Sequence, residues 1–159
     1  MIDHPFEPVY SINSNILILG SFPSVKSRNE NFYYAHLQNR FWKLIAKIYN
    51  EETPITVEEK KNIILKNNLA IWDVIKSCDI VGSADNTIQN VEINDVNRLI
   101  SKNNIKKVIF NGKKSFELYI KHNNKLANVE YIELPSTSPA NAKYSFDKLY
   151  NIWCKALTE

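Results

Sequence analysis

The sequence contains only three glycines and two cysteines among its 159 residues, and nothing in its composition suggests a disordered or fibrous chain. The cysteines, Cys78 and Cys154, lie far apart and show no CxxC spacing. Alone they cannot hold an iron–sulfur cluster, and a structural zinc site would need two further ligands. We therefore interpret them as reduced thiols of a cytoplasmic protein, and we expect neither a metal nor another cofactor.

Long apolar runs are also absent. None approaches the roughly 20 residues that a membrane-spanning helix needs, and residues 1–5 are polar and interrupted by proline, unlike a secretory signal. We therefore expect no membrane partner. Lys and Arg exceed Asp and Glu by only three, 20 against 17, which permits binding to a polyanion without requiring it. An enzyme that acts on DNA would have to gather its positive groups on one face.

Short apolar runs alternate along the chain with amphipathic segments. Strands are predicted at residues 15–19, 69–72, 107–110 and 129–134, and helices at 40–49, 56–67, 94–102, 115–121 and 143–156. This alternation predicts an α/β fold, a three-layer sandwich in which a central four-stranded parallel sheet is flanked by helices, as a single domain over residues 1–159. Ligands of such folds bind beyond the carboxyl ends of the strands. The polar loops there predict one cleft, formed by residues 20–39, 73–90 and 135–142.

The first of these loops carries a run of aromatic residues, Phe32-Tyr33-Tyr34, followed by His36 and Asn39. Three consecutive aromatic side chains cannot all face one core from a loop, so we expect a ring to face the cleft, where a nucleobase could stack on it. Rings that only anchor a long loop would give the same pattern. Asn39 stands at or near the N-cap of the helix predicted at 40–49.

Five blocks of the sequence, in order, resemble one enzyme family. The segment that ends in Asn39-Arg40-Phe41-Trp42 resembles the mismatch-specific members of the uracil-DNA glycosylase superfamily. The likeness is greater to the hypoxanthine-DNA glycosylase branch, also called DNA-deoxyinosine glycosylases. It extends to Gly-Ser-Phe-Pro-Ser at 20–24, Ile-Trp-Asp-Val at 71–74, Gly-Ser-Ala-Asp at 82–85 and Leu-Pro-Ser-Thr-Ser-Pro-Ala-Asn-Ala at 134–142. One departure is Leu37, which replaces the proline usual after His36.

The resemblance implies roles for the residues at matching positions. Asn39 corresponds to the essential asparagine of the branch, whereas Ser21 stands where related branches place a catalytic Asn or Asp. Tyr34 corresponds to the aromatic residue that stacks on the extruded base. The expected base-binding residues are Gly20, Ser21, Phe22, Tyr34 and Asp73, although Asp73 could equally cap the next turn. The loop expected to press into the minor groove of DNA contains Ser136, Thr137, Ser138, Pro139, Ala140 and Asn141.

The implied activity is that of a DNA repair enzyme. We expect a monomeric, monofunctional glycosylase that flips a deaminated base, hypoxanthine, out of double-stranded DNA and hydrolyses its N-glycosidic bond. No lysine nucleophile occurs in the matching blocks, so we expect no strand-nicking step. Two alternatives remain open at this point. One is a mismatch-specific uracil/thymine DNA glycosylase, and the other is a non-catalytic DNA-binding relative.

Overall fold

The centre of the molecule is a four-stranded parallel sheet. The computed structural model describes residues 1–159, and the strands of this sheet lie in the order β3-β2-β6-β7. Their bounds are β2 Ile16–Gly20, β3 Leu69–Asp73, β6 Lys107–Asn111 and β7 Glu130–Leu134. Leu17 of β2 pairs with Ala70 and Val108 on its two sides, and all three are fully buried. Near-continuous apolar strands of this kind are typical of a sheet covered on both faces. The predicted four parallel strands are confirmed.

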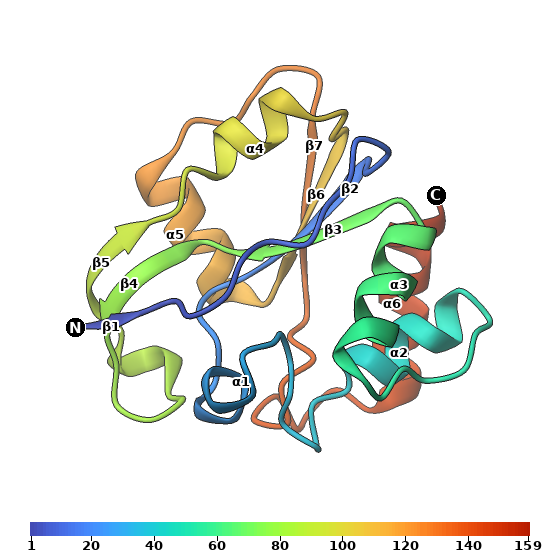
Figure 1. The fold of residues 1–159 in the computed structure, drawn as a ribbon, viewed down its shortest axis with the longest axis horizontal. Coiled ribbons are helices and arrows are strands. Elements are labelled where there is room, and N and C mark those ends of the chain that lie inside the picture. Colours follow the sequence, from blue (N-terminus) through green and yellow to red (C-terminus); the bar gives the residue numbers. More distant parts are fainter.

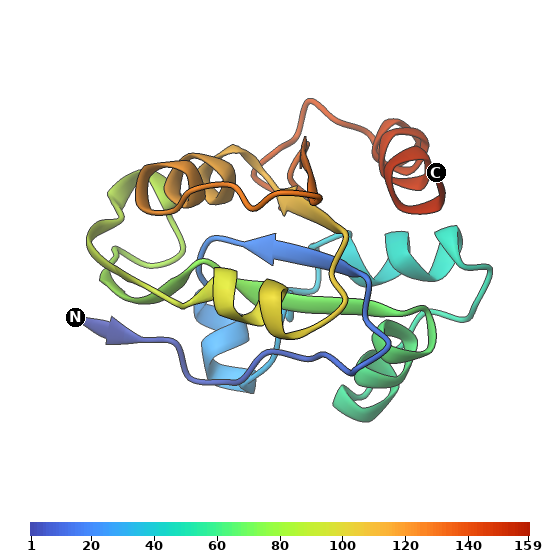
Figure 2. The ribbon, with the colours of Figure 1, turned by 90° about the horizontal axis from the view of Figure 1, so that it is seen from above.

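Helices cover both faces of the sheet. On one face, α2 Phe41–Ile48, α3 Val57–Lys66 and α6 Phe146–Thr158 pack on Ile18, Ile71 and Ile109. The three helices lie together on one side of the sheet in both views (Figures 1 and 2). On the other face, α4 Val96–Lys102 and α5 Lys113–His122 pack on a second apolar cluster that contains Leu17, Leu19 and Phe110. The predicted three-layer sandwich is therefore confirmed.

A second, smaller sheet was not predicted. It is antiparallel, in the order β1-β4-β5, with bounds β1 Ile2–Asp3, β4 Ile75–Asp79 and β5 Gln89–Ile93. Residues 73–90 were expected to form a polar loop, and that expectation was wrong for β4 and for the beginning of β5. Only Val74 separates β3 from β4, so no turn signal marks the passage between the sheets. In β5 only Val91 and Ile93 are apolar and neither is fully buried, so the alternation is too short to indicate a strand.

Helix α1, Val25–Glu30, and a short 3-10 turn, η1 Asp85–Thr87, were also not predicted. Ser24 caps α1 by accepting a hydrogen bond from the Ser27 amide, and Ser27 is the helix's single buried residue. A six-residue helix with one buried side chain lacks the repeated apolar spacing by which helices are predicted. Helix α1 lies at the same edge of the sheet as the segment that follows β7 (Figure 1). No helix is both long and apolar enough to cross a membrane.

Candidate active site

A cleft of about 310 Å³ opens at the carboxyl edge of the parallel sheet. This volume lies at the lower end of the range for small-molecule pockets, roughly 300–1,000 Å³. All three predicted segments line it, through residues at positions 20–24, 27–39, 73–85 and 136–140, and so does Asn111 at the end of β6. The predicted location of the cleft is therefore confirmed. We call residues 21–40 the first loop and residues 135–144 the second loop.

Asn39 lies where the two loops meet. Its backbone amide donates to the His36 carbonyl at 2.9 Å, which closes a turn at the end of the first loop. The N-cap residue of α2 is Arg40, whose side chain makes no capping hydrogen bond. The Asn39 Oδ1 atom instead accepts a hydrogen bond from the Phe41 amide at 3.0 Å. The predicted position at or near the N-cap is therefore correct, because Asn39 satisfies one of the free amides of the helix.

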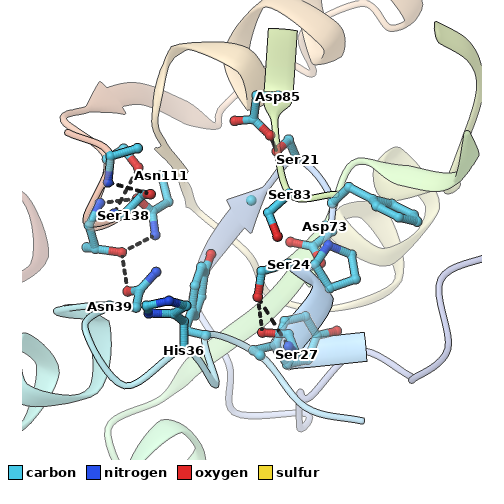
Figure 3. A pocket seen from close by; sticks show the side chains of 18 of the residues that line it. Ser21, Ser24, Ser27, His36, Asn39, Asp73, Ser83, Asp85, Asn111 and Ser138 are labelled. Carbon is cyan, nitrogen blue, oxygen red and sulfur yellow. Dashed lines mark hydrogen bonds between the residues drawn. The ribbon is translucent and has the colours of Figure 1, made fainter. Parts of the chain in front are cut away.

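A chain of hydrogen bonds connects Asn39 to the end of β6. The Thr137 hydroxyl donates to Asn39 Oδ1 at 2.9 Å and accepts from Asn111 Nδ2 at 3.0 Å. The backbone amide of Thr137 donates to Asn111 Oδ1 at 3.0 Å. Sequence reasoning missed Asn111, although its place directly after a buried strand, at the edge where ligands bind, was a usable signal. In Figure 3 Asn39 and Asn111 lie on one side of the cleft, opposite Asp73 and Asp85.

Arg40 attaches the second loop to α2. Its side chain donates hydrogen bonds to the carbonyl oxygens of four residues in that loop: Thr137, Ser138, Asn141 and Tyr144. Its backbone amide donates to the Thr137 carbonyl as well, at 3.1 Å. A planar guanidinium group with five N–H donors can serve several carbonyls at once, which a lysine cannot do. The sequence motif contained Arg40, but this role depends on contacts about 100 residues away and was not foreseen.

The three aromatic residues of the first loop divide between the core and the cleft. Phe32 and Tyr33 are buried in the core, where Phe32 stacks on Trp42. Tyr34 has a left-handed backbone, with φ of 52°, and its ring stacks on Phe41 with centroids 4.2 Å apart. Both interpretations of the aromatic run are therefore correct in part, since Phe32 and Tyr33 anchor the loop in the core, while Tyr34, together with part of Tyr33, lines the cleft.

The Tyr34 hydroxyl is buried and has no partner at normal hydrogen-bond geometry within the protein, although the Asn111 carboxamide lies near enough to oppose the rise of its pKa. Burial, aided by the negative charge of Asp73, raises the pKa of Tyr34 well above its ordinary value. The group is therefore a neutral O–H that lines the cleft without a partner. Because buried polar groups are nearly always paired, an unpaired one beside a cavity suggests that a bound molecule supplies the missing bond.

Asp73 closes the bottom of the cleft at the end of β3. It is only 3% exposed, and its Oδ2 lies 2.7 Å from His4 Nε2. The Phe6 amide donates to His4 Nδ1, so the imidazole presents its Nε2–H to the carboxylate. Asp73 Oδ1 makes no hydrogen bond within the protein. Sequence reasoning missed His4, which lies 69 positions away in a segment without a recognisable motif.

The close packing of Asp73 and Tyr34 against position 20 requires a glycine there. A Cβ atom at this position would lie 2.5 Å from Asp73 Oδ1 and 2.9 Å from the Tyr34 hydroxyl oxygen. Both side chains therefore come against the glycine Cα, and together they form one polar corner of the cleft. The resemblance to the glycosylases implies that Gly20 binds the base. The structure shows that the glycine also makes room for two side chains of the site.

Ser21 and Phe22 continue the same wall. The Ser21 hydroxyl donates to Asp85 Oδ1 at 3.1 Å, which joins the first loop to η1. Partial burial, with a smaller contribution from the charge of Asp73, raises the pKa of Asp85, while Ser21 and Lys114 oppose the shift. Phe22 is 8% exposed and packs mainly into the second apolar cluster. Both residues line the cleft as predicted, but their contact with a base stays a prediction.

The second loop forms the opposite rim. Ser136, Ser138, Pro139 and Asn141 are half-buried and Ala140 is exposed, so these residues can reach a macromolecule lying across the cleft. Thr137 differs, because its side chain is fully buried and bonded to Asn111 and Asn39. Its side chain is thus engaged within the protein, and contact of this loop with DNA, Thr137 included, stays a prediction. No three His, Cys, Asp or Glu side chains come together as a metal-binding group.

The fold and the cleft place the protein in a known class. The chain belongs to the uracil DNA glycosylase superfamily, whose family model matches residues 7–157. This result confirms the resemblance drawn from the sequence blocks.

Two curated relatives, both named hypoxanthine DNA glycosylase, come from Methanosarcina. The protein of Methanosarcina barkeri is 39% identical over 114 residues, which cover 70% of this chain and 72% of that protein. The protein of Methanosarcina acetivorans is 36% identical over 151 residues, which cover 91% of this chain and 92% of that protein. A solution NMR structure of a candidate uracil DNA glycosylase from Methanosarcina acetivorans superposes with a TM-score of 0.82 at 32% identity, covering 99% of this chain and 97% of that one.

Proposed function

We propose that this protein is a monofunctional DNA glycosylase that hydrolyses the N-glycosidic bond of hypoxanthine in double-stranded DNA. The observation that carries the proposal is the position of Asn39, held by two hydrogen bonds at the junction of the loops that line the cleft. The names of the two relatives support the choice of base. We further expect the enzyme to act as a monomer in the cytoplasm.

The cleft suits a base that has lost an amino group by deamination. Deamination of adenine turns the N1 acceptor into an N1–H donor and replaces the amino group by a carbonyl. Asp73 Oδ1, which has no partner in the protein, can accept from that N–H, whereas it would repel the lone pair of N1 in adenine. Tyr34 supplies an aromatic face and an unpaired hydroxyl in the same corner. Uracil offers a similar N–H next to a carbonyl, so the uracil alternative needs a direct test.

The reaction that we propose breaks one bond and forms one. The bond between C1′ of the sugar and N9 of the base breaks, a water oxygen bonds to C1′, and the base leaves with a proton that derives from that water. Positive charge develops on the sugar and negative charge on the departing base, so the site needs groups that hold water and stabilise the base. Asn39 is the proposed catalytic residue for this purpose. No lysine lines the cleft, which supports hydrolysis without a covalent intermediate or strand nicking.

The exposed part of the second loop would hold the DNA. An enzyme acting on a base within a duplex must first extrude it and keep the helix open. We propose that Ser136, Ser138, Pro139, Ala140 and Asn141 contact the minor groove, while Gly20, Ser21, Phe22, Tyr34 and Asp73 surround the extruded base. Arg40 would keep these two groups of residues in register.

The decisive experiment measures base release from a 30-base-pair duplex that carries one deoxyinosine. The wild-type protein should leave an abasic site that alkali cleaves, and it should produce no cleavage without alkali. Asn39→Ala should lower single-turnover base release by at least 100-fold, because one preorganised polar group often contributes that much, while DNA binding measured by fluorescence anisotropy stays within about threefold. A matched control is Asn103→Ala, because Asn103 is likewise a half-buried asparagine with a bonded carboxamide, but its Nδ2 donates to the Leu99 carbonyl and it lies away from the cleft.

Parallel duplexes carrying deoxyuridine, or thymine opposite guanine, test the alternatives. Release of uracil without release of hypoxanthine would contradict the proposed substrate. DNA binding with no release of any base, by wild type and variants alike, would favour the non-catalytic relative.

A further inference from the structure

The hydrogen bonds around Asn39 determine which end of its carboxamide faces the cleft. Asparagine has an acceptor end, Oδ1, and a donor end, Nδ2, which look alike in shape, so the surrounding bonds must identify them. Two backbone amides do so here, because a backbone N–H can only donate. One is the amide of Phe41, which contacts Asn39, and the other is the amide of Thr137, which contacts Asn111.

These two amides determine the donor and the acceptor of every hydrogen bond between Asn111 and Asn39. Because the Thr137 amide donates to Asn111 Oδ1, the other end of Asn111 is its Nδ2, which donates to the Thr137 hydroxyl. With its oxygen accepting that bond, the hydroxyl uses its own proton to donate to Asn39 Oδ1. Asn39 Oδ1 thus accepts two hydrogen bonds, at 3.0 Å from Phe41 and at 2.9 Å from Thr137.

The nitrogen of Asn39 makes no hydrogen bond within the protein. In Figure 3 a dashed line reaches the oxygen of Asn39, while its nitrogen carries none. Asn39 is half-buried and lines the cleft. The acceptor end is therefore occupied by the protein, and the donor end is the one left for a substrate or a water.

We propose that Asn39 works as a hydrogen-bond donor, and that Asn111 and Thr137 are positioning residues that hold its Nδ2–H₂ toward the cleft. This inference rests on the proposed function and makes it more specific. A donor can bind the acceptor atoms of a departing base, where negative charge accumulates, or hold a water by its oxygen. It cannot remove a proton from that water.

The substitution Asn39→Asp tests the donor role. It has nearly the same shape, and one carboxylate oxygen can keep both bonds, from Phe41 and from Thr137. The second oxygen then presents an acceptor where the donor was. We expect single-turnover base release from the deoxyinosine duplex to fall at least as far as in Asn39→Ala, by 100-fold or more. If Asn39→Asp retains wild-type activity, or exceeds it, Asn39 acts as an acceptor and the inference is wrong.

The substitution Asn111→Asp tests the positioning role. The introduced carboxylate still accepts from the Thr137 amide, but it cannot donate to the Thr137 hydroxyl and instead accepts that group's proton. Asn39 Oδ1 then loses one of its two donors. We expect base release at saturating enzyme to fall by about 10- to 100-fold, as small misplacements of catalytic groups do, with DNA affinity little changed.

The pH profile separates this role from a structural one. Protonation of the introduced carboxyl restores an O–H donor, so the activity of Asn111→Asp should rise toward that of wild type as the pH falls below about 5. A loss that stays the same at every pH would contradict the proposed chain. Asn103→Asp is the control, since it loses one carboxamide donor far from the cleft and should show the wild-type profile. Thr137→Ser should keep most of the activity and Thr137→Val should lose it.

An NMR readout tests the geometry independently of catalysis. In the wild-type protein the Thr137 hydroxyl proton is buried and bonded, so it should exchange slowly with water, whereas the Asn39 side-chain amide protons should exchange rapidly. Slow exchange of the Asn39 amide protons would overturn the inference. If this pattern is found but no duplex is cut, the proposed function fails and the inferred geometry stands. If hypoxanthine is released but Asn39→Asp is fully active, only the inference fails.

Discussion

The two loops that form the cleft are held in place by different forces. The first loop, residues 21–40, contributes Phe22, Phe32 and Tyr33 to the apolar clusters on the two faces of the sheet. In the second loop no residue belongs to either cluster, and only Tyr144, at its end, packs against one of them. This loop is held instead by polar contacts, chiefly those that Arg40 makes with its carbonyl groups. One wall of the cleft is thus an extension of the core, and the other is attached by hydrogen bonds.

The difference suggests a division of work between the walls. Apolar burial of large rings contributes several kcal/mol and fixes a wall firmly, which suits the side that must recognise a base. Hydrogen bonds contribute about 1 kcal/mol each on balance and can be re-formed after small shifts, which suits the side that must adapt to DNA. Asn39 lies where the two loops meet. It accepts one hydrogen bond from the amide of Phe41, which is buried in the core, and one from the hydroxyl of Thr137 in the second loop. Changes on the two sides should therefore affect stability and activity differently.

The largest effect on stability should come from the apolar side. Phe32 is 4% exposed and packs on Trp42, so Phe32→Ala removes a buried ring and should lower the free energy of unfolding by about 3–5 kcal/mol. Urea unfolding monitored by tryptophan fluorescence measures this loss. At low temperature, base release per folded molecule should stay within a few fold of wild type. A variant of normal stability would show that the first loop does not depend on this burial.

Substitution of Arg40, which holds the second loop, should cost less stability but more activity than substitution of Phe32. Arg40→Lys keeps the charge but cannot donate to four carbonyl groups, so we expect the free energy of unfolding to fall by about 1–3 kcal/mol. Because the second loop then shifts relative to Asn39, base release should fall by about 10- to 100-fold even where the protein is fully folded. If Phe32→Ala impairs catalysis more than Arg40→Lys does at a temperature where both are folded, the two loops do not divide stability and activity between them in this way.

The contrast also explains which parts of the structure could be predicted from the sequence. The four parallel strands and their helices have apolar residues at regular spacing, so residues such as Leu17 and Ile18 indicate their own burial. The capping box at Thr56 and Glu59 is a local pattern, and the structure contains it. The second sheet could not be predicted, because β5 exposes most of its side chains and because β1 has only two residues and pairs with β4, far along the chain.

The site was predictable to the extent that it depends on local motifs. The run around Asn39 and the loop at 136–141 identified the two walls, and both line the cleft. The polar contacts between the walls were not predictable, because they join residues such as Asn111 and Thr137, or His4 and Asp73, that no local spacing connects. Hydrogen bonds of this kind depend on the arrangement of the sheet as a whole.

The smallest effect concerns the polar link that the first loop itself makes, from Ser21 to Asp85. The pKa of Asp85 is raised in the folded protein, chiefly by partial burial. The folded state therefore binds a proton more tightly than the unfolded state does, and ionisation of Asp85 slightly destabilises the fold at neutral pH. This penalty is fully present above the folded pKa, and it disappears as the pH falls through that pKa to below the unfolded one, about 3.9.

Replacing the carboxyl group by a neutral amide removes the penalty. Asp85→Asn should be slightly more stable than wild type at pH 7, by less than about 0.5 kcal/mol because solvent still reaches Asp85 and screens the cost of its partial burial, and the difference should vanish below about pH 4. Thermal unfolding of both proteins across this pH range measures the difference. A variant less stable than wild type at pH 7 would mean that the charge of Asp85 strengthens its bond with Ser21 by more than burial costs. The first loop would then depend on a polar contact as the second loop does. The two loops would differ less in the forces that hold them than their contributions to the apolar clusters indicate.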